Sequence, residues 1–116
     1  MTKTHKSIEL CIKCLLSCEK CITHCISAEN FNCIQLCRDC ADLCALCIRM
    51  EARNSNYTKK LMALCVEVCK VCSVECNKNL AHHPTCMDCS VACLKCAEAC
   101  EEFILDQATN SISSIA

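Results

Sequence analysis

The chain has 116 residues, with 12 basic and 13 acidic side chains and a net charge near −1, and this length is enough for one small domain. It contains no Gly and no Trp, one Pro, one Tyr and two Phe. Tight hairpin turns and phosphate-binding loops depend on glycine, so the composition argues against an all-β fold and a nucleotide-binding loop. Nucleic-acid binding is also disfavoured, because it needs a basic surface and stacking aromatic side chains.

Nineteen cysteines are the main feature of the sequence. They form four blocks in which the gaps alternate strictly between three and four residues, and such positions share one face of an α-helix. The blocks are Cys11, Cys14, Cys18, Cys21, Cys25; Cys33, Cys37, Cys40, Cys44, Cys47; Cys65, Cys69, Cys72, Cys76; and Cys86, Cys89, Cys93, Cys96, Cys100. Bundles normally place Leu, Ile and Val there, so the pattern predicts four helices that present sulfur to a shared core.

Four stretches carry the helical periodicity, at about residues 4–28, 31–53, 56–79 and 84–105. The connections between them are short, so consecutive helices should run antiparallel. We therefore predict an all-α fold, an up-down-up-down four-helix bundle with a cysteine-lined core, over residues 1–105. The remainder, 106–116, is rich in Ser, Thr and Asn and is expected to fray.

Residues with specific turn preferences mark two of the connections. Asn54 suits a left-handed position after the second helix, and Ser55 suits the N-cap of the third. Pro84 suits the first turn of the fourth helix, where Thr85 and Asp88 form a pair like a capping box.

Cysteine is too small to fill the seam of a bundle by itself. Each Leu-to-Cys reduction should cost on the order of 1–3 kcal/mol, and the sum would exceed a typical total stability of about 5–15 kcal/mol. Disulfides within a helix are disfavoured, because Cβ atoms one turn apart are roughly 5–6 Å from each other whereas a disulfide needs about 3.5–4.5 Å. The sequence thus predicts an open, thiol-lined tube that something else fills.

A metal is the remaining filler, and charge favours copper. Zinc bound by four thiolates carries a net −2, so four or five such sites would bury roughly ten negative charges. Cu(I) is soft and monovalent and favours thiolates, so about one ion per cysteine would neutralise the core. Iron–sulfur clusters need four cysteines that converge on one point, which an even spread along helices does not supply.

The first and last cysteine blocks, with the His82-His83 pair before the last, resemble those of the bacterial cysteine-rich four-helix-bundle copper-storage proteins. The likeness extends from about Thr4 to Leu105. It implies thiolates that hold many Cu(I) ions along the core, and bundles that associate, commonly as tetramers. Exported members carry a twin-arginine signal; this sequence shows neither that motif nor a membrane span and resembles the cytosolic branch, so we expect a cytoplasmic protein.

The predicted topology gathers metal-binding side chains at one end of the bundle. His24, His82 and His83 should lie there beside the outermost cysteines, and we expect copper to enter at this end. The opposite end should be plugged by apolar side chains, namely Ile8, Tyr57, Leu61, Met62 and Phe103. Met62 occupies the place of a fifth cysteine in the third helix, as a plug or as a secondary thioether ligand.

The leading interpretation is a non-catalytic protein that stores and buffers Cu(I), for detoxification or for supply. A copper chaperone or a copper enzyme is a possible exchange partner. One alternative is a Zn/Cd thiolate buffer, which would bind far fewer metals than it has cysteines. Another is a thiol-redox protein, which needs one Cys-x-x-Cys pair with a distinctively lowered pKa.

Overall fold

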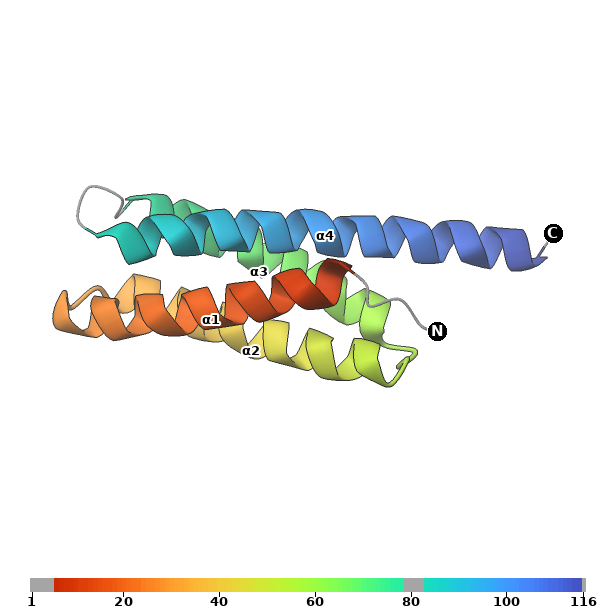
Figure 1. Cartoon of the computed structure of the whole chain (residues 1–116), viewed down its shortest axis with the longest axis horizontal. Helices are drawn as coiled ribbons and strands as arrows, with labels where there is room; N and C mark the ends of the chain where they lie inside the picture. The colour runs from red at the N-terminus through yellow and green to blue at the C-terminus, as the bar shows by residue number, and fades with distance from the viewer. Residues whose placement is uncertain (1–5, 79–82, 116) are drawn as a thin grey trace.

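The computed structural model of the chain describes residues 6–78 and 83–115, with side chains described as far as residue 107. The described chain contains four α-helices and is all-α, which confirms the predicted fold class (Figure 1). Their bounds are α1 Lys6–Ser27, α2 Phe31–Ala52, α3 Thr58–Lys78 and α4 Pro84–Ile115.

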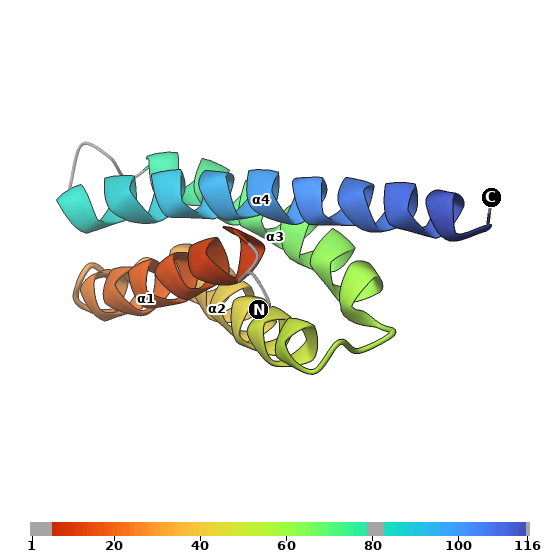
Figure 2. The ribbon, with the colours of Figure 1, turned by 45° about the vertical axis from the view of Figure 1, so that its right-hand side comes forward.

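The helices form an elongated bundle with extents of 54 × 21 × 20 Å. Helices α1 and α2, α2 and α3, α3 and α4, and α4 and α1 pack side by side, whereas the diagonal pairs make no close backbone contact within the described residues. Consecutive helices run in opposite directions, as Figures 1 and 2 show from two sides. Each helix therefore presents one face to a single central axis.

The connections use residues other than glycine at left-handed positions, because the chain has no glycine. Glu29, after α1, has φ 55°, and Asn54, after α2, has φ 53° as its sequence context predicts. Asn30 then caps α2 by accepting a hydrogen bond from the Cys33 backbone N–H (3.2 Å). Ser55 Oγ accepts the Tyr57 backbone N–H (3.1 Å) just before α3.

Helix α4 begins at Pro84, as the sequence predicts, but its cap differs from the prediction. His83 Nδ1 accepts a hydrogen bond from the backbone N–H of Thr85 (3.1 Å) and lies 2.6 Å from Thr85 Oγ1. The predicted Thr85–Asp88 capping pair is wrong, because both residues already lie inside the first turns of the helix.

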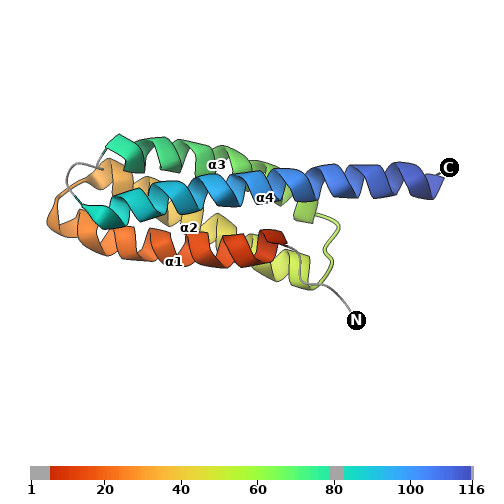
Figure 3. The ribbon, with the colours of Figure 1, turned by 45° about the horizontal axis from the view of Figure 1, so that its top comes forward.

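The end of α4 also differs from the prediction. We placed it at residue 105, but the helix continues to Ile115 and projects beyond the ends of its neighbours (Figures 1 and 3). The segment 106–115 contains neither Gly nor Pro, the residues that most strongly terminate helices, so the backbone continues its hydrogen-bonded pattern. Its fraying stays a prediction.

Two buried polar pairs hold helices together outside the cysteine seam. Ser7 Oγ on α1 donates to Glu51 Oε1 on α2 (2.9 Å). Ser73 on α3 and Ser90 on α4 each donate a hydroxyl hydrogen bond to the other's backbone carbonyl (2.9 Å each). Among the described residues, no helix has the length and apolar character that a bilayer crossing requires.

Candidate metal centre

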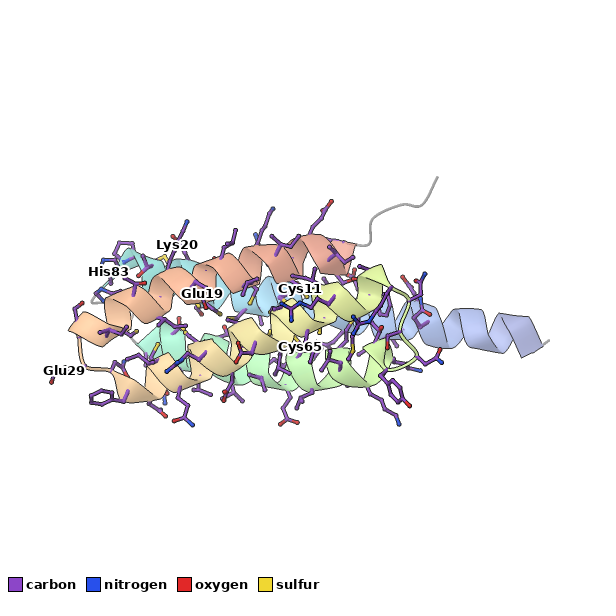
Figure 4. The ribbon with its side chains drawn as sticks, turned by 90° about the horizontal axis from the view of Figure 1, so that it is seen from below. Cys11, Glu19, Lys20, Glu29, Cys65 and His83 are labelled. Atoms are coloured by element: carbon purple, nitrogen blue, oxygen red, sulfur yellow. The ribbon has the colours of Figure 1, made fainter. Side chains whose placement is uncertain are left out.

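All nineteen cysteines lie on the inward faces of the four helices, each at most 1% exposed. Every one of them is a free thiol. Figure 4 shows two of them, Cys11 and Cys65, which come from α1 and α3 and lie between the helices. The strict three-and-four spacing produces this arrangement, because it keeps each block on one stripe of its helix.

The thiols do not surround an open tube. Cys40 Sγ on α2 lies 3.5 Å from Cys69 Sγ on α3 and 3.9 Å from Cys93 Sγ on α4. Cys21 Sγ on α1 reaches Cys76 Sγ on α3, across the diagonal, at 3.9 Å. The predicted open tube is therefore wrong: sulfur atoms meet on the axis and form a packed column.

The sulfur column contains several sets of four thiols whose sulfur atoms lie within 4.8 Å of one another. These sets include Cys11, Cys44, Cys65, Cys96; Cys14, Cys44, Cys69, Cys96; Cys14, Cys18, Cys40, Cys93; Cys18, Cys72, Cys89, Cys93; and Cys21, Cys33, Cys37, Cys76. Several cysteines belong to two of the first four sets, so these four sets are connected along the column. The first set takes one cysteine from each helix.

The spacing of the sulfur atoms suits a soft metal of low coordination number. With metal–sulfur bonds of about 2.3 Å, two sulfurs on one ion lie ~4.0 Å apart in trigonal geometry and ~4.6 Å apart in linear geometry. The contacts between thiol sulfur atoms, from 3.5 Å for Cys40–Cys69 to 4.0 Å for Cys72–Cys76, are only slightly shorter. Small outward shifts of the sulfur atoms would thus admit ions along the whole column.

The protonation of the column is shared among neighbouring thiols. Burial raises the pKa of Cys25 and raises that of Cys86 to about 12, so both thiols are neutral near pH 7. A hydrogen bond with Cys33 lowers the pKa of Cys21 to about 3, because a neighbouring thiol stabilises the thiolate. Metal binding would replace these thiol protons, so protons must leave as ions enter.

The end of the bundle at which α1 ends and α4 begins carries two of the predicted histidines. The rings of His24 and His83 stack with centroids 3.7 Å apart and an interplanar angle of 23°, and Figure 4 shows His83 at this end of the molecule. Both rings are half-buried, next to the outermost thiols Cys25 and Cys86. His82 lies outside the described residues.

His83 has a structural role that its sequence position does not suggest. Its Nδ1 accepts the Thr85 backbone N–H, so the neutral ring carries its proton on Nε2. Coordination of a metal through Nε2 would require that proton to leave Nε2. If the proton moved to Nδ1, Nδ1 could no longer accept the Thr85 N–H, and the cap of α4 would break.

The opposite end is closed, though not by every residue that we predicted. Met62 is fully buried and Phe103 is 9% exposed, while Ile8 and Leu61 are half-buried. Tyr57 is 65% exposed, so its predicted role as a plug is wrong. It lies in the connection before α3, one residue short of the inward-facing register.

Sequence reasoning missed a polar layer beyond the last thiols at the closed end. Ser7, Glu51 and Thr58 are 2%, 6% and 4% exposed. Ser7 lies four residues before Cys11, Glu51 four residues after Cys47, and Thr58 four residues before Met62. Extending the same periodicity by one turn would have found them, because the inward stripe of a helix does not stop at its last cysteine.

Comparisons with known proteins agree with this geometry. Residues 1–105 match the family described as "Copper storage protein" (Csp). The chain is 40% identical over 97 residues to the uncharacterized cysteine-rich protein YhjQ of Bacillus subtilis (strain 168), covering 80% of this chain and 88% of that protein.

Solved structures are similar over most of the chain. Apo copper storage protein 3 from Bacillus subtilis has 39% identity and a TM-score of 0.79, covering 84% of this chain and 95% of that one. The Cu(I)-bound copper storage protein BsCsp3 has 38% identity and a TM-score of 0.78, with 83% and 92% covered. Ccsp from Streptomyces lividans, loaded with 10 copper equivalents, has 31% identity and a TM-score of 0.81, with 86% and 82% covered. The chain, with its sulfur column and its match over residues 1–105, belongs to the copper storage protein family.

Proposed function

We propose that the chain stores and buffers Cu(I), with the nineteen core cysteines as ligands and about one ion per cysteine when full. The observation that carries this proposal is the continuous column of sulfur atoms 3.5–4.0 Å apart, contributed by all four helices. The copper-bound state of the similar proteins BsCsp3 and Ccsp supports the choice of metal.

Charge favours Cu(I) over Zn²⁺ or Cd²⁺ in this core. Among the described residues, the only ionisable side chain buried besides cysteine is Glu51, which is acidic. No buried cation is therefore present to balance the net −2 of a divalent ion with four thiolates. Cu(I) with one thiolate per ion leaves a neutral core, which a low-dielectric interior tolerates far better.

No catalysis is proposed for the column. A thiol-redox enzyme needs a pair of cysteines that is both reactive and accessible, whereas all nineteen thiols here, including Cys21 with its lowered pKa, are at most 1% exposed. The stored copper can serve detoxification or supply, through exchange with a copper chaperone or a copper enzyme.

The histidine end is the proposed point of uptake. The rings of His24 and His83 stack on each other there, close in sequence to the outermost thiols Cys25 and Cys86, while Met62 and Phe103 close the other end. Imidazole is an intermediate ligand that can pass a soft ion to a thiolate. His82 is adjacent in sequence and is proposed as a further ligand at the mouth, with Met62 as a plug at the far end.

We further propose that the chain self-associates, as a tetramer by resemblance to its family, and works in the cytoplasm. Exposed apolar side chains on several helices, including Leu16, Val74 and Val91, support self-association. Free thiols support a reducing compartment, because thiols at contact distance would oxidise readily elsewhere.

The decisive experiment is metal stoichiometry under anaerobic conditions. The reduced chain is titrated with Cu(I) against a chromophoric chelator, and separately with Zn²⁺, with thiol titration before and after loading. We expect well over ten Cu(I) per chain and nearly complete protection of the thiols. A copper capacity of four to five ions, equal to that for zinc, would instead support a divalent thiolate buffer.

A further inference from the structure

The contact between α1 and α4 differs from those of the other three neighbouring helix pairs. A hydrogen bond between side chains joins each of those pairs: Ser7–Glu51 for α1–α2, Asn32–Glu75 for α2–α3 and Ser73–Ser90 for α3–α4. Among residues 6–78 and 83–107, no hydrogen bond or ion pair outside the cysteines joins α1 to α4. These helices are the first and last of the chain and lie side by side without a connection (Figure 3). Their contact should therefore open at lower cost than the others.

A groove lies along this contact, with α1 on one side and α4 on the other. Its volume is about 440 Å³, within the range of about 300–1,000 Å³ that small-molecule sites occupy. Leu10 and Leu16 of α1 and Met87 and Val91 of α4 form its apolar walls. The groove therefore has the size and lining to hold a small organic molecule with an apolar stem.

The groove is basic, although the chain as a whole carries a net charge near −1. Lys13 and Lys20 of α1 and Lys95 of α4 line it, against one acidic side chain, Asp88. All three lysines are exposed, and none forms an ion pair with another described side chain. The excess of two positive charges favours an anionic ligand, such as one that carries carboxylates.

The groove lining includes two small side chains next to core cysteines. Ser17 and Ala92 are half-buried and have the smallest side chains of the lining. They are adjacent in sequence to Cys18 and Cys93, whose sulfur atoms lie 3.9 Å apart in the column. A slight separation of α1 and α4 at this place would expose these two thiols to the groove.

Met87 adds a soft metal ligand to the groove. It is the one exposed sulfur-containing side chain among residues 6–78 and 83–107, with an exposed fraction of 49%. All nineteen cysteines and Met62 are buried, and Met50 is half-buried. Because thioethers bind Cu(I), Met87 can hold an ion between the column and a ligand in the groove.

We propose that the α1–α4 groove binds a thiol of low molecular weight that carries carboxylates, and that Cu(I) passes between this acidic thiol and the sulfur column there. The lysines bind the carboxylates, the apolar walls hold the stem, and Met87 relays the ion. This inference rests on the proposed storage of Cu(I). It adds a route of exchange at the side of the bundle, separate from uptake at the histidine end.

The exchange is a ligand substitution in which charge and protons balance. For one ion on one cysteine, a small thiolate and a small neutral thiol together replace the cysteine. Two bonds form between copper and the small sulfur ligands, the copper–cysteine bond breaks, and the proton of the neutral thiol moves to the freed cysteine sulfur. Copper remains Cu(I), so no oxidant or reductant is required. The departing complex of one Cu(I) with two thiolates is anionic, which suits a basic groove.

The first test measures how fast the Cu(I)-loaded chain gives up copper to an excess of a chromophoric chelator. Mercaptosuccinate, a thiol with two carboxylates, should accelerate this transfer about tenfold relative to mercaptoethanol, which has none, at equal thiolate concentration. Lys13→Glu/Lys95→Glu should abolish the difference. The matched control Lys59→Glu/Lys60→Glu, which makes the same charge change outside the groove, should retain it. Equal effects of the two double variants would overturn the proposal.

The second test examines the wall of the groove. Ala92→Leu adds apolar contact between α1 and α4, and should slow the transfer to mercaptosuccinate several-fold. Ala45→Leu is the matched control, because Ala45 is also half-buried beside a cysteine but lies on α2, outside the groove. Slower transfer in both variants, or in neither, would contradict passage of copper through this wall.

The third test examines the thioether. Met87→Leu keeps the apolar volume and removes the sulfur, so the transfer to mercaptosuccinate should become several-fold slower. Met50→Leu, the same change on α2, should leave the rate unchanged. Unchanged transfer in Met87→Leu would overturn the relay through Met87.

The outcomes separate this proposal from the proposed function. Cu(I) capacity and circular dichroism, expected to be unchanged in every variant, verify that storage and fold are intact. A parent chain without copper capacity would overturn storage and this inference with it, whereas full capacity with transfer indifferent to the carboxylates would overturn the groove alone. Transfer that depends on His24 and His83 but not on the lysines would assign the exchange to the histidine end. Self-association that covers Leu16 and Val91 would also make transfer independent of the lysines, and would overturn the groove.

Discussion

The imidazole rings of His24 and His83 lie 3.7 Å apart, centroid to centroid, and connect the last turn of α1 to the residue before α4. Two side chains that can bind metal are thus stacked on each other at the end of the bundle where α1 ends and α4 begins. His83 is further held by its hydrogen bond with the Thr85 backbone. Uptake of an ion at this end requires the stack to open.

Replacement of both rings should slow copper uptake without reducing capacity. In His24→Ala/His83→Asn, Asn retains an oxygen that can cap α4, while both imidazole ligands are lost. We expect uptake of Cu(I) from a chromophoric chelate to become several-fold slower in stopped-flow measurements, with the final ratio of copper to protein unchanged. Thr23→Ala, a neighbouring exposed change, serves as the control. Uptake as fast as in the parent chain would remove the histidines from the uptake route.

Met62 provides a test of what closes the other end. Met62→Ala should lower the free energy of unfolding by about 2–5 kcal/mol, because it leaves a cavity in a fully buried site. Met62→Leu keeps the volume but removes the sulfur, and should cost less than about 1.5 kcal/mol. Urea unfolding measures both values. A copper capacity that falls in Met62→Leu would show that the thioether is a ligand and not only a plug.

The reciprocal Ser73–Ser90 pair should stabilise the contact between α3 and α4. Ser73→Ala removes one hydroxyl donor and leaves the Ser90 carbonyl without it, so we expect a loss of about 1–2 kcal/mol. The double variant Ser73→Ala/Ser90→Ala should lose less than the sum of the single variants, since the two hydroxyls also contact each other (3.0 Å). Strict additivity in this double-mutant cycle would contradict the coupling.

The left-handed residue after α1 offers a stabilising substitution. Glu29 has φ 55°, a region in which any residue with a Cβ atom is strained. Glu29→Gly should therefore raise the free energy of unfolding by about 0.5–1 kcal/mol. Ala28→Gly, one residue earlier and without positive φ, should lower it. Thermal unfolding of the two variants would show opposite shifts in Tm; shifts in the same direction would rule out this account.

The pH dependence of the metal-free chain should report the buried thiol Cys86. Its pKa is raised from 9.0 to about 12, so the unfolded state loses this proton first as the pH rises. The contribution of Cys86 to stability is therefore complete below pH 9 and is lost between about pH 9 and 12. Urea unfolding of the parent chain should lose stability over this range more steeply than Cys86→Ser. Parallel pH profiles would contradict the raised pKa.

The sequence was sufficient to predict the bundle, because its periodicity is unusually complete. Four blocks with strict three-and-four gaps can share a core in very few ways, and the cysteine stripes are found there without exception. Asn54 was also predictable, since a chain without glycine has few residues suited to a left-handed turn.

Other features depend on contacts between segments far apart in the sequence. The stack of His24 on His83 and the Ser73–Ser90 pair arise only after two helices are placed side by side. The packed state of the column was missed because the helices approach closely enough for short side chains to meet. The end of α4 was missed because Ser, Thr and Asn suggest a tail but do not by themselves terminate a helix.

The sulfur column also connects the cargo of the protein to its lifetime. Ions that bind only the folded chain stabilise it by mass action, more strongly as more sites are filled. A full bundle should therefore resist unfolding and proteolysis, and an empty one should be removed first. Turnover would then remove copper-free chains and spare copper-loaded chains. The amount of protein that survives would therefore reflect how much copper the cell has stored.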